Sequence, residues 1–340
     1  YFIQQNIVIG HLNHPPVTHT YPARGDYDVA ITGSINGWNF SGAKGGDRRK
    51  LLDVSRWGPL KVGNDGAYFQ NASNMTVTAT DPLNLTDTTN LSAMFAGVPK
   101  FNGAIGNWDT SAVTNMSSMF SGASTFNQPL NSWNTSSVSN MSNTFFGANA
   151  FNQPLSNWRT GNVTTMSRMF FAARAFNQPI NPDGAKWNTG NVTTMQQMFY
   201  AANRFNQNLD GWDTSNVTNL SETFRQATDF NGAIDDWDVS KVTTLYYTFG
   251  QATAFNKPLN SWNTERVTAM GGTFYEADAF NQPIGHWNTS AVTDMTWMFN
   301  RADRFNQPID TEADYSRWVT SNVTSMNRMF ESAIAFNQDL

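Results

Sequence analysis

The sequence predicts a repeat solenoid of about ten 25-residue turns, with short parallel strands and short helices, behind a small β-rich N-terminal cap. Two observations predict this fold class. A Phe-Asn pair returns mostly every 25 residues, and the same apolar columns of Trp, Val, Met and Phe accompany it. A period between about 20 and 50 residues is typical of units that bury their apolar faces only by stacking on one another. The pairs are Phe101-Asn102, Phe126-Asn127, Phe151-Asn152, Phe176-Asn177, Phe205-Asn206, Phe230-Asn231, Phe255-Asn256, Phe280-Asn281, Phe305-Asn306 and Phe336-Asn337.

Residues 1–22 form an N-terminal arm and Pro-containing linker outside the repeats. Apolar, strand-forming residues open this arm, and Pro15, Pro16 and Pro22 follow them. Such an arm can add a strand to a neighbouring subunit, or it can form the first strand of its own cap. Both hypotheses stay open, and the candidate assembly residues are Phe2, Ile3, Ile7, Val8 and Ile9.

Residues 23–56 are predicted to form the β-rich cap, and residues 57–340 the solenoid. The segment Tyr27–Gly33 is rich in β-branched residues and ends in Gly, which is typical of a strand followed by a turn. An atypical terminal unit is expected, because the first repeat would otherwise expose its apolar end to water.

One short helix is expected in each repeat. Four apolar residues stand at offsets of 0, 3, 4 and 7, the spacing of one helical face: Met116, Met119, Phe120 and Ala123. Thr114 or Asn115 would cap this helix. Helix capping therefore explains the recurring Thr column better than a flat, ice-binding hydroxyl array does.

Two segments of each repeat compete as the parallel strand. Residues 126–130 are short and bounded by polar residues, but Pro129 weakens a central strand there. Residues 113–116 carry a β-branched residue in every copy. Both segments could be extended, on opposite sides of the coil.

The Trp and Asn columns are interpreted as structural. A Trp present in every copy is expected to pack in a core ladder, with its indole N–H bonded to a backbone carbonyl, rather than to form an exposed strip that stacks on sugars. The Asn after each Phe is expected to form a side-chain ladder that satisfies turn backbone groups.

The candidate interaction edge combines two signals. Both long repeats insert their extra residues just before the Trp, so the insertions must project from one edge of the rod. Arginines also recur at variable positions near the Ala column, where an anionic group could bind. The candidate residues are Asp183, Lys186, Glu312, Tyr315, Arg174, Arg204, Arg225, Arg301 and Arg304.

Composition argues against several functional classes. Only 14% of the residues are charged and the net charge is −5, so nucleic acid is not an expected partner. No stretch is apolar enough for membrane insertion. Four His residues without metal-ligand spacing and the absence of Cys predict no catalytic residue, metal site or cofactor. The acidic group Asp235, Asp236 and Asp238 is interpreted as a solvated edge.

The repeat phrase W-x-T-S-x-V-T-x-M-x-x-M-F-x-x-A-x-x-F-N-Q-P-L, present from Trp57 to Leu340, resembles the repeats of BspA-like bacterial surface proteins. These relatives of the leucine-rich repeats occur in mycoplasma and listeria type surface lipoproteins. The resemblance implies a leucine-rich-repeat-like, right-handed solenoid and a role in surface attachment or protein interaction, without a catalytic residue. Unlike those lipoproteins, this chain has no lipobox Cys.

The leading functional hypothesis is a non-catalytic extracellular or cell-surface protein that mediates adhesion or protein–protein interaction. The alternative is the structural subunit of an extracellular filament, in which identical subunits join through the arm and the last repeat. A weaker alternative is a carbohydrate-binding module for surface glycans.

Overall fold

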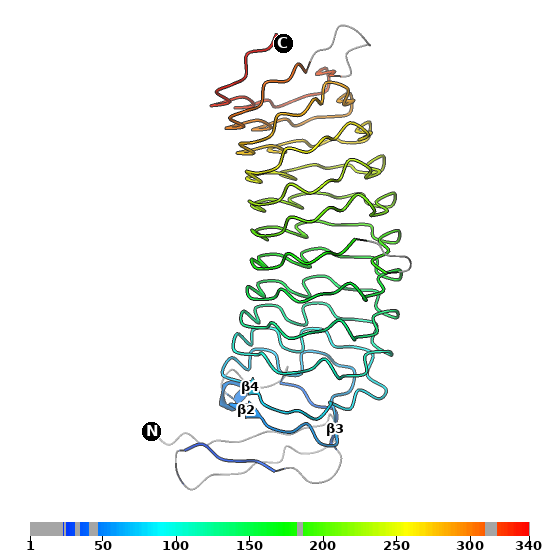
Figure 1. The fold of residues 1–340 in the computed structure, drawn as a ribbon, viewed down its shortest axis with the longest axis vertical. Helices are drawn as coiled ribbons and strands as arrows, with labels where there is room; N and C mark the ends of the chain where they lie inside the picture. The colour runs from blue at the N-terminus through cyan, green and yellow to red at the C-terminus, as the bar shows by residue number, and fades with distance from the viewer. Residues whose placement is uncertain are drawn as a thin grey trace.

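The computed structural model describes residues 23, 25–30, 35–40, 47–181, 186–309 and 318–339. The chain winds into successive coils that lie one on another along the long axis, with the N-terminal coils at one end and the C-terminal coils at the other (Figure 1). Backbone hydrogen bonds join neighbouring coils, as from Ser139 N to Thr114 O at 2.9 Å and from Thr164 N to Ser139 O at 3.0 Å. Each coil is therefore tied to both of its neighbours.

The regular elements of the described residues lie in the first coils. They are β1 (Ile35–Asn36), the 3-10 helix η1 (Asp47–Lys50), β2 (Asp53–Val54), β3 (Leu60–Lys61) and β4 (Thr76–Val77). β1 pairs in parallel with β3, and β2 in parallel with β4. The strand predicted at Tyr27–Gly33 is wrong for its described part, because residues 27–30 have no regular structure.

Further along the chain, the parallel ladder narrows to one residue per coil. Single bridges link Asn90 to Asn115, Asn115 to Asn140, and so on up to Asp294 and Ser325. The segment around residues 113–116 is thus the one that pairs. The strand predicted at residues 126–130 is wrong, since these residues have no strand and Pro129 has no N–H to donate.

The predicted short helices are also wrong, since the described residues contain no α-helix. Met119 N donates to Met116 O at 3.2 Å, closing a turn in which Ser118 has a φ of 57°. A positive φ at the third residue is the feature of type II turns. Ser118 N and Phe120 N instead donate to the next coil, at 2.8 and 2.9 Å. Consecutive turns therefore reproduce the helical spacing of apolar residues, while alternate amides hold the next coil.

The Thr column has a different role from the predicted one. Thr114 and its equivalents are exposed, and each hydroxyl donates to a backbone carbonyl of the preceding coil, as from Thr114 Oγ1 to Thr89 O at 3.2 Å. Asn115 Oδ1 accepts the N–H of Ser117 at 2.9 Å. The side-chain cap thus exists, but it closes a turn rather than a helix.

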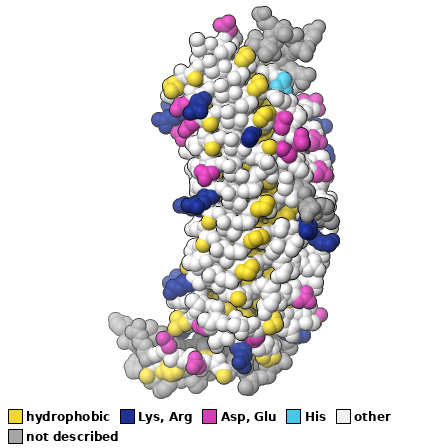
Figure 2. All heavy atoms as spheres, viewed as in Figure 1, with side chains coloured by type: hydrophobic (Ala, Val, Ile, Leu, Met, Phe, Trp, Pro, Cys, Tyr) yellow, Lys and Arg dark blue, Asp and Glu magenta, His cyan; other side chains and the backbone are white. Residues whose placement is uncertain are grey.

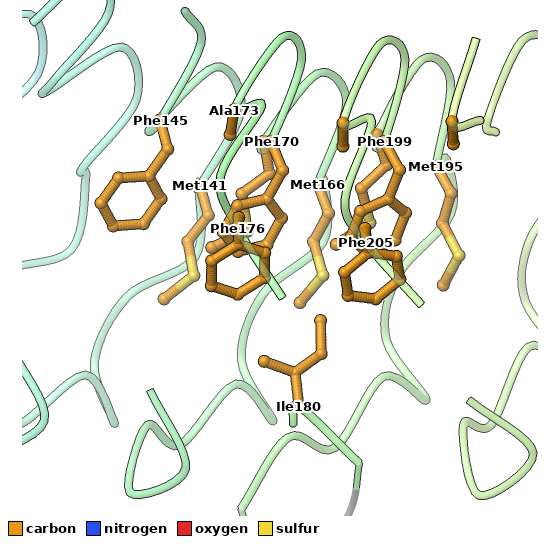
Figure 3. Close-up of a cluster of buried hydrophobic side chains, with 14 of the residues drawn as sticks. Met141, Phe145, Met166, Phe170, Ala173, Phe176, Ile180, Met195, Phe199 and Phe205 are labelled. Carbon is orange, nitrogen blue, oxygen red and sulfur yellow. The ribbon is translucent and has the colours of Figure 1, made fainter. Parts of the chain in front are cut away.

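Aromatic rings from successive coils stack in the core. The Phe145 ring lies 5.5 Å from that of Phe120 and 5.5 Å from that of Phe170, with interplanar angles of 11° and 6°. Figure 3 shows the rings of Phe145, Phe170 and Phe199 beside Met141, Met166 and Met195, which repeat from coil to coil. All of these side chains are fully buried. The stack forms one continuous interior along the described repeats.

The Trp prediction is confirmed. The repeat tryptophans from Trp108 to Trp287 are at most 4% exposed, and Trp318 is half-buried. Trp158 Nε1 donates to Leu130 O at 2.9 Å, and Trp187 Nε1 to Leu155 O at 2.8 Å. From Trp133 to Trp318 each indole is bonded to the coil before it, whereas the buried Trp108 Nε1 has no hydrogen-bond partner among the described residues. Burial of these rings is incompatible with an exposed sugar-stacking strip.

The Asn ladder is confirmed as well. Asn127 Oδ1 accepts the backbone N–H of Asn152 at 3.0 Å and the Nε2–H of Gln153 at 3.1 Å. The same side-chain bond to the next coil recurs from Asn102 to Asn306. Side-chain amides therefore provide the link between coils at the segment where no strand forms.

Candidate functional site

Each coil has two edges on opposite sides of the core. We call residues 116–125 and their equivalents the turn edge, and residues 130–136 and their equivalents the Trp edge. Figure 3 shows Ala173 of the turn edge and Ile180 of the Trp edge on opposite sides of the stacked rings. Figure 2 shows sparse charged side chains and a line of apolar side chains along the visible face of the rod.

The turn edge alternates constant and variable positions. Its buried Met, Phe and Ala recur from coil to coil, whereas the position of Ser118 carries different residue types along the chain. The residues at this position are Ser118, Asn143, Arg168, Gln197, Glu222, Tyr247, Gly272, Trp297 and Arg328. The buried constant positions form the core stack, and the variable positions differ from coil to coil.

A half-buried aromatic ladder occupies one variable position. The rings of Phe146 and Phe171 lie 4.5 Å apart with an interplanar angle of 9°, and those of Phe171 and Tyr200 lie 4.5 Å apart at 6°. Because these rings face one another along the rod, their faces are covered. Only ring edges reach the surface, a poor platform for stacking a sugar.

Arg225 continues this ladder into the next coils. Its guanidinium lies 4.3 Å from the centre of the Tyr247 ring and 5.7 Å from that of Tyr200. The same group forms an ion pair with Glu222 at 3.0 Å. Arg225 therefore bridges three coils through cation–π contacts and one charge-assisted hydrogen bond.

Beyond Arg225, four aromatic side chains form a cluster. Tyr247 contacts Tyr246, Tyr275 and Trp297, with ring centres 4.7, 5.5 and 6.5 Å away and steep interplanar angles. Tyr246 is 41% exposed and Trp297 is 36% exposed, and no other large apolar residue described between 57 and 309 is exposed. Burial, together with nearby Tyr246, raises the pKa of Tyr247 to about 12, so its hydroxyl stays protonated.

Backbone strain accompanies the cluster. Tyr247 and Trp297 have φ values of 49° and 59°, and a bulky residue with positive φ costs about 1 kcal/mol or more. Gly272 takes this position in the coil between them, and the Tyr247 ring lies over it: a Cβ there would come within 2.5 Å of the ring. The aromatic rings are thus held in place despite an unfavourable local conformation.

A chain of side-chain hydrogen bonds links successive coils beside the aromatic cluster. Gln226 Nε2 donates to Gln251 Oε1 at 2.9 Å, and Gln251 Nε2 donates to Glu276 Oε2 at 2.9 Å. Arg301 donates to the other oxygen of Glu276 at 2.9 Å. Burial works to raise the pKa of Glu276, but the hydrogen bonds from Gln251 and Arg301 outweigh it and lower the pKa below its ordinary value. Glu276 is therefore ionised and paired.

The structure places all five predicted arginines on the turn edge. Arg225 lies over Tyr247 of the aromatic cluster, and Arg301 is paired with Glu276. The other three are exposed: Arg174, Arg204 and Arg304. Lys186 is half-buried at the Trp edge, next to the insertion. Asp183, Glu312 and Tyr315 lie outside the described residues, as do the arm residues Phe2, Ile3, Ile7, Val8 and Ile9.

Sequence reasoning missed Tyr246, Tyr247, Tyr275 and Trp297. A signal was present for Tyr246, Tyr247 and Trp297, because these aromatics stand at positions where other coils have Ser, Asn or Gln, whereas Tyr275 shares its position with Phe146, Phe171 and Tyr200. Column-by-column comparison of the variable positions would have shown the departure, whereas attention to the recurring residues concealed it.

The Trp edge has a shallow hollow and an acidic group. The hollow, about 480 Å³, is lined by residues 131–136 with Asn157 and Arg159. Across neighbouring coils, Asp210 faces Asp235 and Asp236. Burial is the main cause that raises the pKa of Asp210, and the negative charges of Asp236 and Asp235 raise it further. No group of His, Asp and Glu among the described residues is arranged to hold a metal ion.

Replacing Asp210 with Asn, the residue at the equivalent positions 131 and 260, is expected to stabilise the protein at neutral pH by less than about 1 kcal/mol. The raised pKa means that ionising Asp210 opposes folding, so wild-type stability falls as pH rises through the ordinary Asp value of 3.8 toward the raised pKa. Urea unfolding should show the advantage at neutral pH and none well below 3.8. An equal advantage at both pH values would contradict this electrostatic origin.

Within the described part of the chain, the structure contains no helix with the length and apolarity of a membrane span. Three stretches of the sequence, residues 64–182, 180–282 and 257–340, match a family model described as "Mycoplasma protein of unknown function, DUF285". No curated protein and no solved structure matches the chain. The matched stretches overlap and together extend over the repeats from residue 64 to residue 340.

Proposed function

Because the chain belongs to the repeat family described as Mycoplasma protein of unknown function, DUF285, we propose that it is a non-catalytic protein of the cell surface. Its stacked repeats form a leucine-rich-repeat-like solenoid of the BspA-like type. Its turn edge binds a protein partner outside the cell. Adhesion to another surface is the role that such a rod serves.

One observation carries this proposal: the turn edge displays Tyr246 and Trp297, and no other large apolar side chain described between residues 57 and 309 is exposed. Protein interfaces concentrate their binding energy in Trp, Tyr and Arg. Arg225 lies over the ring of Tyr247, which contacts both Tyr246 and Trp297. Tyr246 and Trp297 are exposed on one edge, and Trp297 also has a positive φ, so a recognition role accounts for them best.

A protein partner suits this edge better than a glycan does. Sugar recognition needs an open ring face, and the ladder of Phe146, Phe171 and Tyr200 offers only ring edges. The rings of the cluster pack at steep angles, which gives a compact knob rather than a platform. A knob of this kind fits a pocket on another protein.

The test is attachment of beads coated with the purified protein to immobilised matrix proteins, mucin and cultured cells. Wild-type beads are expected to attach, and the double variant Tyr246→Ser/Trp297→Ser should lose about tenfold or more in affinity. Serine occupies these positions in other coils, at Ser142 and Ser118, so the variant should keep its fold. Thermal unfolding checks this.

The matched control is Arg159→Ser, an exposed change on the Trp edge. It should leave attachment unchanged. Equal attachment by wild type and double variant would overturn the proposed role of the turn edge. Attachment to glycan-coated beads alone would favour the carbohydrate hypothesis, and fibres in electron micrographs of the pure protein would favour the filament.

A further inference from the structure

One column of the turn edge carries opposite charges in different parts of the rod. We call the position of Ser124 and its equivalents the charge column; its residues are Ser124, Asn149, Arg174, Asn203, Thr228, Thr253, Asp278, Asp303 and Ile334. Its three charged residues are all exposed. Arg204, one position further in the coil after Arg174, is exposed too, and its N–H donates to the Arg174 carbonyl at 3.4 Å. Two adjacent arginines therefore occupy one part of the edge and two adjacent aspartates another.

These four charges are not compensated within the described chain. Arg174, Arg204, Asp278 and Asp303 form no ion pair with a described residue. Partial burial raises the pKa of Asp278, and the negative charges of Asp303 and Glu276 raise it further. Charges of one sign thus lie together in each part of the edge, and an opposite charge from outside would stabilise them.

The arginine pair and the aspartate pair are complementary, but one chain cannot bring them together. Arg174 and Asp303 stand five coils apart, which is about 24 Å at the spacing of hydrogen-bonded strands. A second copy can join them. When two copies face each other through their turn edges and run in opposite directions, a two-fold axis across the rods sets each column against the same column in reverse order.

One antiparallel register satisfies all four charges. Arg174 of one copy then faces Asp303 of the other, Arg204 faces Asp278, and the symmetry forms each contact twice. A shift by one coil would set Arg174 against Asp278 or Ile334 and leave Arg204 without an aspartate. Two parallel copies in register would place arginine against arginine, which is unfavourable.

The position of Ser118 independently favours the same register. Arg168 occupies it in the coil of Arg174, and Trp297 occupies it in the coil of Asp303. The register that joins Arg174 to Asp303 therefore sets Arg168 against Trp297, and both side chains are exposed. A guanidinium over an indole is a favourable cation–π contact. Charge pairing and aromatic contact thus agree on one arrangement.

Two other charges oppose this register. Arg304 follows Asp303 and would lie beside Arg174 of the second copy, and Asp229 would lie close to its own counterpart near the two-fold axis. Both are exposed, and other coils carry alanine at their position, as at Ala254 and Ala279. Arg304→Ala and Asp229→Ala should therefore each tighten the association of two copies, about two- to fivefold.

We propose that the partner of the turn edge is a second copy of this chain, bound antiparallel through the coils from Arg174 to Asp303. This inference rests on the proposed function and names its partner class. Copies on two facing surfaces run in opposite directions, so the arrangement joins one surface to the other. A strip about 24 Å long is short for a stable dimer, so the single contact is weak and many copies side by side strengthen it.

The experiment is sedimentation velocity of the full chain over a concentration series. Wild type should show a monomer–dimer equilibrium with no larger species. The double variants Arg174→Asp/Arg204→Asp and Asp278→Arg/Asp303→Arg should each weaken the dimer about tenfold or more, because both ends of the strip then carry one sign. An equimolar mixture of the two variants should dimerise again, since each supplies the charges that the other lacks.

The matched control is Arg159→Asp/Arg266→Asp, which makes the same charge change at exposed positions outside the turn edge. It should weaken the dimer by less than about twofold. The test variants should fold, because the charge column already carries Arg and Asp and the position of Arg204 carries Asp229 in another coil. Thermal unfolding checks this.

Three results would overturn the proposal. They are wild type that stays monomeric at every concentration, a mixture that does not dimerise, and a control that loses as much as the test variants. Assemblies larger than a dimer would replace the closed pair with a filament.

The two proposals fail separately. If bead attachment depends on Tyr246 and Trp297 while wild type stays monomeric, the turn edge binds a different protein and the second copy is the wrong partner. If the charge variants behave as expected while wild-type beads attach to none of the surfaces, the antiparallel dimer stands and attachment to those surfaces is wrong.

Discussion

Replacing Phe170 with alanine is expected to lower the free energy of unfolding by about 3–5 kcal/mol. The ring is fully buried and stacks against Phe145, Phe176 and Phe199, with ring centres 5.5, 4.1 and 5.6 Å away. Truncation removes the transfer free energy of the ring and leaves a cavity between three coils. Urea unfolding followed by circular dichroism measures the loss.

The adjacent residue supplies the control. Phe171 stacks only at the edge, 4.5 Å from Phe146 and 4.5 Å from Tyr200, and it is half-buried. Phe171→Ala makes the same chemical change one position away, so its cost should be clearly smaller, about 1–2 kcal/mol. Equal losses for the two variants would contradict the division between a core stack and an edge ladder.

The Phe170 variant should also unfold less cooperatively. In an array, each coil is stabilised mainly by its neighbours, so a weak coil in the middle uncouples the two halves. We expect a broader transition, or two transitions, where the wild type shows one. A sharp single transition of unchanged slope would show that the coupling passes through other columns.

Replacing Asn152 with alanine is expected to destabilise the protein by about 1–3 kcal/mol. Asn152 Oδ1 accepts the backbone N–H of Asn177 at 3.0 Å and the Nε2–H of Gln178 at 3.1 Å. Alanine leaves both donors without this acceptor at a partly buried link between two coils. Chemical denaturation provides the measurement.

Two further variants identify the cause. Asn152→Asp keeps an oxygen acceptor for both donors, so it should retain most of the stability. Asn149→Ala, in the same coil, removes an exposed side chain that forms no hydrogen bond with the described residues, so its effect should be near zero. A large loss for Asn149→Ala, or an equal loss for Asn152→Ala and Asn152→Asp, would refute the ladder as the source of the effect.

The buried residues of the repeats could be predicted because each coil packs on its neighbours in the same way. The same space recurs in each coil, so the same Trp, Phe and Asn are required there. The indole N–H bond of Trp158 and the amide link of Asn127 follow from this reasoning. Periodicity alone was sufficient for these columns.

Local conformation could not be predicted from the same pattern. The offsets of Met116, Met119 and Phe120 fit a helix and a series of turns equally well. The choice depends on where the amide of Phe120 donates, and it donates to the next coil at 2.9 Å. A bond to a residue 24 positions away, Thr144, has no signature in the local sequence.

The candidate site lay beyond sequence reasoning for a related reason. The predicted arginines lie on the turn edge, but the aromatic cluster on that edge combines Tyr247, Tyr275 and Trp297, which are separated by more than 20 residues in sequence. None of these residue types is unusual alone. Only the stacking of neighbouring coils brings these rings into contact.

The sequence by itself therefore determined the period, the buried columns and the Asn link between coils, because every repeat needs the same residues at these positions in order to stack on its neighbours. The tertiary structure alone decided that turns replace helices and that an aromatic knob and a carboxylate share one edge. The physical reason is that these features depend on hydrogen bonds and contacts between coils, and such contacts exist only once the coils are stacked.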